Sequence, residues 1–220
     1  MNVLELFSGT GSVGKCCKEL GWDVVSVDLI LPADHQVNIM DFDYKQYPKD
    51  FFDIVWASPP CTNYSLLKKC WYGRKLKDGT IYNRELNEKE MDEADKLVLK
   101  SLEIINYFNP EYWFLENPQT GSLKNRNIMK GLSYYDVDYC MYSDWGYKKR
   151  TRIWTNKKNW ENKLCNGKCG NMVGSLHKNN LGNADRFKRE NLENVNKYSG
   201  TSQQDRYRIP PDLIYSLFLN

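Results

Sequence analysis

The chain has 220 residues, of which 41% are hydrophobic and 27% are charged, and its formal net charge is +3. This length and composition predict one ordinary globular domain with at most a small appendage, and no apolar run is long enough to span a membrane. The slight positive charge permits nucleic-acid binding but does not require it.

Residues 1–155 alternate short apolar runs with helical patterns, which is typical of βαβ units and a parallel sheet. The run at residues 136–142 alternates apolar and polar side chains instead, which indicates a half-exposed antiparallel strand. We therefore expect an α/β fold with a mostly parallel sheet. Strands are expected at residues 3–7, 22–27, 52–57, 112–115, 136–142 and 152–155, and helices at residues 13–20, 92–108 and 211–219.

The last third of the chain changes character. Beyond Asn156 the periodicity fades into Asn, Gly and Lys, until the short apolar helix at residues 211–219. We expect residues 1–155 to form the main domain and residues 156–208 a small appendage. Residues 209–220 are expected to pack back on the sheet as a terminal helix.

The cysteine count and the start of the chain bear on its location. Seven cysteines is an odd number, and the chain opens directly on a strand-like run without a signal-peptide pattern. We therefore expect a cytoplasmic, intracellular protein that does not contact membranes, with reduced thiols that are available to a metal ion. We assume a monomer.

The segment Ser8–Gly11 follows the first expected strand, where ligands bind in open α/β sheets. Its glycines let the backbone approach a ligand closely. Asp28, 17 positions after Gly11 at the end of the second strand, is placed to bind both hydroxyls of a ribose. Asp41 and Phe42 follow a third strand end and are suited to cover an adenine edge. Because the glycines do not match the pyrophosphate-binding pattern, they favour S-adenosylmethionine over a nucleotide, or a tight turn without a ligand.

Cys61 follows a strand end and two prolines in the segment Ser58-Pro59-Pro60-Cys61. The prolines restrict the backbone, so the thiol is presented rigidly at the ligand-bearing edge of the sheet. A cysteine is usually a small buried hydrophobic residue, but a turn of this kind favours a reactive thiol.

Glu116 closes the next strand, and both strand ends open onto the same edge of the sheet. Its carboxyl group is therefore expected to meet the Cys61 thiol, although alone it would equally suit a helix N-terminus. Arg150 and Arg152 share one side of a later strand by the period of two, which alone indicates an exposed basic strand.

Together these motifs resemble, in order and approximate spacing, those of the cytosine-C5 DNA methyltransferase family. The motifs are Leu4-Glu5-Leu6-Phe7-Ser8-Gly9-Thr10-Gly11, Ser58-Pro59-Pro60-Cys61, Glu116-Asn117-Pro118 and Arg150-Thr151-Arg152. The resemblance covers residues 1–155, and the combination is specific although each motif is not. It implies a Rossmann-like class I S-adenosylmethionine-dependent methyltransferase fold, with a mixed, mostly parallel seven-stranded sheet and helices on both faces.

The resemblance implies an S-adenosylmethionine site. Asp28 would bind the ribose with Leu29 beside it, and Pro60 would pack near the adenine. Asp41 would accept from the adenine amine, next to Phe42. The methionine and adenosine would be lined by Phe7, Ser8, Gly9, Thr10 and Gly11.

The resemblance also implies the chemistry on the base. The Cys61 thiolate would attack C6 of a flipped-out cytosine, Glu116 would hydrogen-bond N3 and the amino group, and Arg152 would grip O2. C5 then takes the methyl group, and loss of the C5 proton with elimination of Cys61 completes the cycle. The residues expected to contact nucleic acid are Arg150, Lys148 and Ser65.

Three positions depart from the family pattern. Thr62 stands where Gln commonly follows the cysteine, Pro118 where Val is common, and Tyr147-Lys148 where Pro-Gln is usual. These departures bear on turnover and loop closure more than on the core chemistry. Because Pro-Pro-Cys also occurs in the tRNA-directed branch of the family, DNA is the favoured substrate and RNA the alternative.

Two other functions fit part of the pattern. A methyltransferase for adenine N6 or cytosine N4 would carry an aromatic residue at position 61 and leave Glu116 and Arg152 without a part. A non-catalytic relative that binds S-adenosylmethionine or nucleic acid is suggested by the missing Gln and the short tail. The intact Cys61, Glu116 and Arg152 argue against it.

Two segments have further expected roles. Residues 62–90 are polar, basic and aromatic, and in the family this region is the mobile loop that closes over the flipped base; the simpler alternative is a long disordered loop. In the tail, Cys165, Cys169 and His177 are residue types that bind zinc, but only three ligands are evident. Because residues 156–208 are few for target recognition, we expect a reduced recognition region or a zinc clip there.

Overall fold

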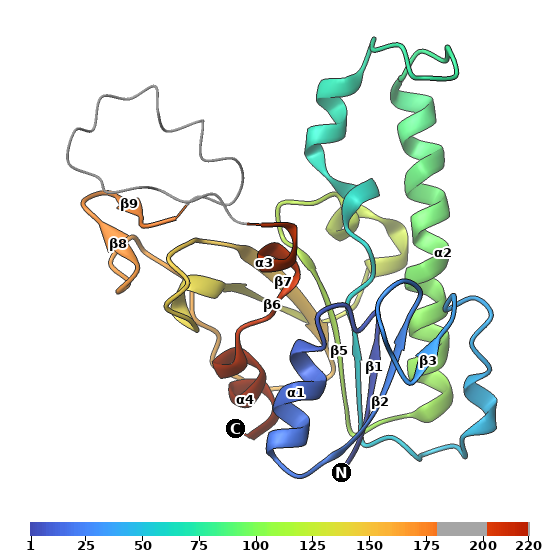
Figure 1. Cartoon of the computed structure of the whole chain (residues 1–220), viewed down its shortest axis with the longest axis vertical. Helices are drawn as coiled ribbons and strands as arrows, with labels where there is room; N and C mark the ends of the chain where they lie inside the picture. The colour runs from blue at the N-terminus through green and yellow to red at the C-terminus, as the bar shows by residue number, and fades with distance from the viewer. Residues whose placement is uncertain (180–201, 220) are drawn as a thin grey trace.

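A seven-stranded sheet lies at the centre of the computed structural model, which describes residues 1–179 and 202–219. Its strands are β1 (Asn2–Leu6), β2 (Asp23–Asp28), β3 (His35–Gln36), β4 (Ile54–Ala57), β5 (Tyr112–Pro118), β6 (Tyr134–Asp138) and β7 (Arg150–Thr155). They follow the order β3-β2-β1-β4-β5-β7-β6 (Figure 1). The strands from β3 to β5 are parallel, whereas β7 runs antiparallel to both of its neighbours.

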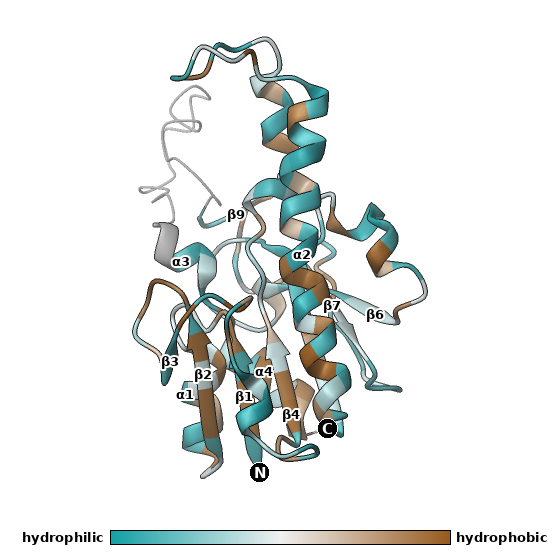
Figure 2. Cartoon of the chain, turned by 90° about the vertical axis from the view of Figure 1, so that its right-hand side faces the viewer, coloured by the Kyte–Doolittle hydropathy of each residue, from teal (hydrophilic) through white to brown (hydrophobic). Residues whose placement is uncertain are grey.

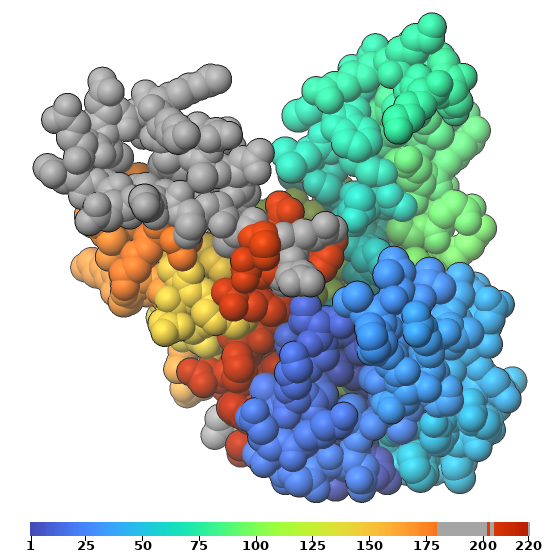
Figure 3. All heavy atoms as spheres, in the orientation of Figure 1, coloured from blue at the N-terminus to red at the C-terminus, as the bar shows by residue number. Residues whose placement is uncertain are grey.

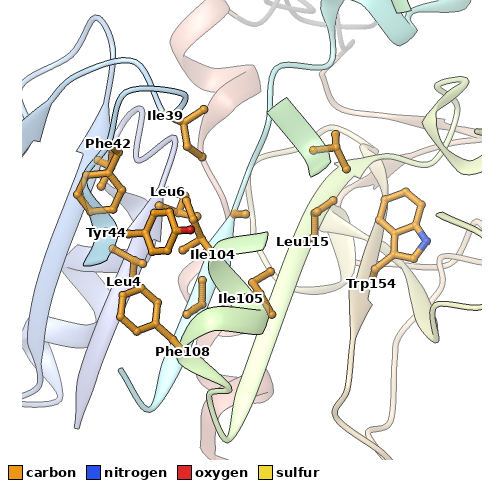
Figure 4. Packing of buried hydrophobic residues seen from close by; sticks show 14 of the residues in the cluster. Leu4, Leu6, Ile39, Phe42, Tyr44, Ile104, Ile105, Phe108, Leu115 and Trp154 are labelled. Carbon is orange, nitrogen blue, oxygen red and sulfur yellow. The ribbon is translucent and has the colours of Figure 1, made fainter. Parts of the chain in front are cut away.

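Helices cover both faces of this sheet. Helices α1 (Ser12–Glu19) and α4 (Pro211–Leu219) lie on one face, and α2 (Arg84–Phe108) lies on the other. Successive strand residues point to opposite faces, so Val3 packs with α1 and α4 while Leu4 packs with α2 (Figure 4). Strands buried on both faces are mostly apolar, which explains the nearly continuous apolar runs in the sequence.

The terminal helix α4 packs against the sheet and α1. The ring of Phe218 lies 5.9 Å from Trp22, 6.1 Å from Trp56 and 5.4 Å from Phe114, measured between ring centroids. Aromatic pairs at these distances add to the burial of their large apolar surfaces. The carboxyl end of the chain is thereby attached to the same layer as its first helix.

Helix α2 begins at Arg84, eight residues before the expected start at residue 92. Asn83 is its N-cap, and the Asn83 side chain accepts a hydrogen bond from the Leu86 amide at 2.8 Å. The added turns are hydrophilic, and Figure 2 shows the apolar stripe of α2 mainly where the helix crosses the sheet. Apolar periodicity therefore could not reveal them.

Strand β6 and the segment after it also differ from expectation. The strand is Tyr134–Asp138, and a 3-10 turn, Tyr139–Met141, replaces the remainder of the expected strand at residues 136–142. The antiparallel direction is confirmed by the pairing of β6 with β7. The turn carries Tyr139 and Cys140 into the interior, where both are buried.

Residues 62–90, which we call the arm, are ordered rather than structureless. They contain 3-10 turns at Thr62–Tyr64 and Leu66–Trp71, followed by the first turns of α2. Glu90 joins the two sides, since it accepts from Lys68 Nζ at 2.6 Å and from the Tyr82 hydroxyl at 2.5 Å. The arm projects beyond the carboxyl edge of the sheet (Figure 1).

The appendage contains little regular structure in the part that is described. Strands β8 (Met172–Val173) and β9 (Leu176–His177) form a short antiparallel pair. Helix α3 (Gln203–Tyr207) leads into α4. Among the described helices, none combines the length and apolar character needed to cross a bilayer.

Candidate active site

The turn between β1 and α1 is held by the side chain at the end of β2. Gly9 and Gly11 have φ angles of +52° and +66°, which favour glycine. The Gly9 amide donates to Asp28 Oδ2 at 2.9 Å, and the Gly11 amide donates to Ser8 O at 2.7 Å. The predicted cofactor turn and the predicted ribose ligand thus form one structural unit.

Glu5 is a residue of this region that the sequence patterns did not single out. Its carboxylate oxygens accept hydrogen bonds from the amides of Val13 at 3.2 Å and Gly14 at 3.0 Å. Glu5 is only 3% exposed, and burial raises its pKa to about 7. Amides at a helix N-terminus are those that bind phosphate in nucleotide sites, so their use by Glu5 suits a ligand without phosphates. The sequence feature that could have identified Glu5 is the presence of an acidic residue inside an otherwise apolar strand.

The segment after β2 offers apolar surface beside Asp28. Ile30 is 77% exposed, and Leu29 and Leu31 are also exposed. Asp28 Oδ1 accepts from the amides of Ile30 and Leu31, each at 2.8 Å. A carboxylate has about four acceptor positions, and these two amides and that of Gly9 use three of them, so Asp28 retains one, on Oδ2, for a ribose hydroxyl.

Asp41 and Phe42 point to different environments. Asp41 is exposed, but Phe42 is only 4% exposed, and its ring lies 5.0 Å from the His35 ring (Figure 4). The expectation that the Phe42 ring covers an adenine edge is therefore corrected, because burial in the core removes that ring from the surface. Only Asp41 of this pair is accessible to a ligand.

Cys61 lies just beyond the end of β4. Pro59 is buried and Pro60 is exposed at this turn. The Asn117 side-chain amide donates to Pro59 O at 2.9 Å, so the end of β5 holds the backbone that carries the thiol. The Cys61 carbonyl accepts from the Tyr64 amide at 3.1 Å, which starts the first turn of the arm. Both sides of the thiol are thereby fixed.

The surroundings of Cys61 include three charged residues. Burial raises the pKa of the Cys61 thiol, and the negative charge of Glu116 raises it further. The positive charges of Lys149 and Arg206 act in the opposite direction. The thiol predicted to be reactive therefore lies within electrostatic range of the predicted carboxyl group and of two cations that were not predicted.

Glu116 is 7% exposed and is contacted by two groups. The Tyr139 hydroxyl donates to Glu116 Oε1 at 3.1 Å, and Lys149 Nζ lies 3.5 Å from the same oxygen. Lys149 is itself 8% exposed, donates to Arg206 O at 2.9 Å, and lies over the Tyr139 ring at 4.6 Å. A cation and a carboxyl group thus form an ion pair near the carboxyl end of β5, and their charges act on the thiol that follows β4.

Arg152 is not part of this group, which corrects its expected place beside Glu116. In the register of β5 and β7, Glu116 pairs with Ile153, whereas Arg152 pairs with Asn117. Arg152 therefore points to the other face, where it makes two hydrogen bonds to Asp136 at 2.7 and 2.9 Å. Side chains alternate between the two faces of a strand, so Arg150 and Arg152 share one face and Lys149 points to the opposite face.

The residues expected to contact nucleic acid have partners within the chain. Arg150 makes two hydrogen bonds to Asp138 at 3.1 and 3.2 Å, and Lys148 Nζ lies 3.3 Å from the same carboxylate. The Ser65 hydroxyl accepts from the Leu67 amide at 3.3 Å at the start of the second 3-10 turn. Arg150 and Lys148 remain partly accessible.

The segment before α4 lies against the cofactor turn. The Ile209 amide donates to the Ser12 hydroxyl at 3.2 Å, and the Tyr147 hydroxyl donates to Asp205 O at 2.7 Å. Figure 3 shows the surface hollowed between this segment and the arm. The hollow opens at the carboxyl edge of the sheet, where Cys61 lies.

A separate cluster consists of Cys140, Cys165, Cys169 and His177, whose ligand atoms all lie within 4.8 Å of one another. Sequence spacing indicated the last three residues. It missed Cys140, which comes from the 3-10 turn after β6. We refer to these residues as the Cys/His cluster.

Comparisons with known proteins place this site in a family. No family model matches the sequence. A frog virus 3 (isolate Goorha) protein named "Probable DNA (cytosine-5)-methyltransferase" is 38% identical over 221 aligned residues, which cover 99% of this chain and 98% of that protein. A solved structure of a methyltransferase from Entamoeba histolytica is 15% identical with a TM-score of 0.50, and the match covers 75% of this chain and 55% of that one. This likeness confirms the Rossmann-like class I methyltransferase fold. The near full-length relative confirms the resemblance of the motifs, and the chain belongs to the DNA (cytosine-5)-methyltransferase family.

Proposed function

We propose that this protein transfers a methyl group from S-adenosylmethionine to C5 of a flipped-out cytosine in DNA, through a covalent bond between Cys61 and C6. The observation that carries the proposal is the ion pair between the Glu116 carboxyl and the Lys149 ammonium group, whose charges act on the Cys61 thiol. Addition to a pyrimidine ring requires a nucleophile, a group that acts on N3 and a cation near the developing charge.

The residues around the β1–α1 turn fit S-adenosylmethionine. Asp28 keeps acceptor capacity for the ribose, Asp41 is accessible to the adenine amine, and Leu29 and Pro60 are exposed apolar surface. Glu5 already uses the amides that a phosphate would need. The methionine and adenosine would lie along Phe7, Ser8, Gly9, Thr10 and Gly11. When bound there, S-adenosylmethionine supplies an electrophilic methyl group.

Cys61 and Glu116 activate the base. The thiolate adds to C6, the electrons of the C5–C6 double bond shift toward the C4–N3 side of the ring, and Glu116 in its protonated form donates a hydrogen bond to N3 as that atom becomes basic. C5 is then electron-rich and accepts the methyl group. A solvent water molecule then takes the C5 proton, the electrons of the C5–H bond restore the C5–C6 double bond, the bond between C6 and sulfur breaks, and the Cys61 thiolate is released.

Lys149 takes the part that the sequence assigned to Arg152. Its ammonium group lies 3.5 Å from the Glu116 carboxylate and has hydrogen-bond capacity left for the O2 atom of a base held by Glu116. Arg152 instead forms a bidentate pair with Asp136. We assign it the structural role of joining β6 to β7.

DNA contacts are assigned to the arm and to the segment before β7. The arm carries exposed basic residues, and it borders the hollow at the carboxyl edge of the sheet (Figure 3). Closure of the arm over a flipped base would bring Ser65 to the base, while Lys148 and Arg150 contact the phosphate backbone. The exposed basic residues of the arm are Lys69, Arg74, Lys75, Lys77, Arg84 and Lys89.

Covalent trapping tests the proposal. Duplex DNA with 5-fluorocytosine cannot lose its C5 substituent as a proton, so the adduct should persist when S-adenosylmethionine is present. We expect a band that resists denaturing electrophoresis with wild-type protein and with Cys70→Ser, which replaces an exposed cysteine of the arm that takes no part in the adduct. The Cys61→Ala variant should give none.

The same assay separates the alternatives. RNA of matched sequence should not form the adduct; trapping on RNA alone would replace DNA as the substrate. Methyl transfer to an exocyclic nitrogen without any adduct would contradict the role of Cys61. Cofactor binding without transfer to DNA or RNA would show a non-catalytic relative.

A further inference from the structure

We propose that the Cys/His cluster is a structural Zn²⁺ site, and that it holds the 3-10 turn that carries Tyr139 against Glu116. The metal site itself does not depend on the proposed reaction, because none of its ligands belongs to the active site. Three thiolates and one imidazole are a common donor set for structural zinc. The site comprises Cys140, Cys165, Cys169 and His177.

The distances within the cluster suit a tetrahedral ion. Zn–S bonds of about 2.3 Å and Zn–N bonds of about 2.0–2.1 Å place sulfur and nitrogen about 3.5 Å apart at tetrahedral angles. His177 Nε2 lies 3.6 Å from Cys165 Sγ and 3.4 Å from Cys169 Sγ. All seven cysteines of the chain are in the described residues and none forms a disulfide, so all three thiols are available.

The surrounding backbone supports an anionic sulfur. The Gly167 amide donates to Cys165 Sγ at 3.4 Å, and Lys148, whose ammonium donates to Cys165 O at 3.2 Å, adds a positive charge nearby. A zinc site with three thiolates carries a net negative charge, which such groups offset. The cluster is therefore embedded in groups that favour the metal-bound form.

The appendage also needs a covalent or metal link. Between residues 161 and 179, Cys165 is the only buried apolar side chain, and Asn171 is the other buried residue. The β8–β9 pair has two residues in each strand, which is too little to be stable in water by itself. Segments that lack a core of their own are commonly held by a metal ion.

A chain of contacts links the cluster to the active site. Cys140 directly follows Tyr139, whose hydroxyl donates to Glu116 Oε1 at 3.1 Å. The Asn171 side-chain amide donates to Cys140 O at 2.8 Å, and the Gly146 amide donates to Asn171 Oδ1 at 2.9 Å. The metal would therefore hold both the turn that contains Cys140 and the loop that leads to Lys149.

Metal analysis of the full-length, untagged protein tests the site. We expect about one zinc per chain in wild-type protein purified without added metal, and the same in Cys70→Ser. Each variant that removes one ligand should lose most of that zinc; the variants are Cys140→Ser, Cys169→Ser and His177→Gln. Zinc absent from the wild type, or retained in Cys140→Ser, would overturn the proposal. So would a Cys165–Cys169 disulfide in the freshly purified protein.

Cobalt substitution keeps the proposal testable if the ligand variants do not fold. Wild-type protein stripped by a chelator and titrated with Co²⁺ should show the visible bands of tetrahedral cobalt, together with thiolate-to-cobalt charge transfer. Octahedral cobalt bands would contradict a Cys₃His site.

The link to Glu116 is tested separately. Removal of zinc should lower Tm by several degrees and slow methyl transfer, and added Zn²⁺ should restore both. Zinc removal that leaves both unchanged would overturn the link. Cys61→Ala should abolish transfer yet keep its zinc, so failure of the proposed reaction and failure of the metal site are distinguishable.

Discussion

Lys149 Nζ lies 3.5 Å from Glu116 Oε1, and both side chains are only 9% exposed. A buried pair of this kind stabilises little as a whole, but removal of one partner leaves the other charge buried without compensation. Near the Cys61 thiol, such a pair also offers a carboxyl group and a cation that can hydrogen-bond the polar edge of a cytosine base. Both consequences can be measured.

We expect Lys149→Met to lower kcat/KM for methyl transfer by about 10²–10³-fold, the usual cost of removing one donor to a developing charge. Lys149→Arg should retain more activity because it keeps the cation. Arg152→Gln should lower Tm through loss of its pair with Asp136 but reduce kcat/KM less than Lys149→Met. Steady-state transfer of a labelled methyl group to DNA, with melting curves of each variant, provides both readouts. A greater loss in Arg152→Gln would return the role to Arg152.

The rate of Cys61 alkylation should depend on pH in a direction set by its neighbours. Burial and the Glu116 charge raise the thiol pKa, so the thiolate fraction and the alkylation rate should still be rising above pH 9, the ordinary pKa. Glu116→Gln should shift the profile to lower pH, and Lys149→Met should shift it to higher pH. Iodoacetamide labelling read by peptide mass spectrometry isolates Cys61 from the other thiols. Identical profiles in the two variants would show that neither charge acts on Cys61.

Much of the fold follows from the sequence because parallel strands buried on both faces form continuous apolar runs. Leu4 and Leu6 pack on one face of the sheet and Val3 packs on the other. The apolar run of β1 therefore indicates a strand buried on both faces. The ends of these strands also determine where Asp28, Cys61 and Glu116 lie.

The parts that were missed depend on contacts between distant segments. Lys149, rather than Arg152, reaches Glu116 because of the register between β5 and β7, and a shift by one residue exchanges the two faces. No local pattern fixes that register. Cys140 joins the Cys/His cluster only through the packing of the appendage, and Phe42 is buried by contacts with His35 that sequence spacing does not show.

Glu5 should make the stability of the protein depend on pH. Its pKa is about 7 in the folded chain and 4.5 as the ordinary value, so its contribution is complete below pH 4.5 and is lost as the pH rises through 7. A shift of this size corresponds to about 3 kcal/mol of unfolding free energy. Glu5→Gln, which cannot titrate, should flatten that dependence. Urea unfolding of both proteins between pH 4.5 and 8 measures the difference, and parallel curves would contradict it.

The basic arm should determine how strongly salt weakens DNA binding. Each phosphate contact contributes about 0.9 to the slope of log affinity against log salt concentration, so replacing Arg74, Lys75 and Lys77 by Gln should reduce the slope by about 2–3. The matched control replaces Lys18, Lys49 and Lys158, exposed residues at the opposite edge of the sheet, and removes the same net charge. Fluorescence anisotropy over a salt series gives both slopes. If the control changes the slope as much as the arm variant, the attraction comes from net charge, and DNA is not held at the edge where Cys61 and Glu116 lie.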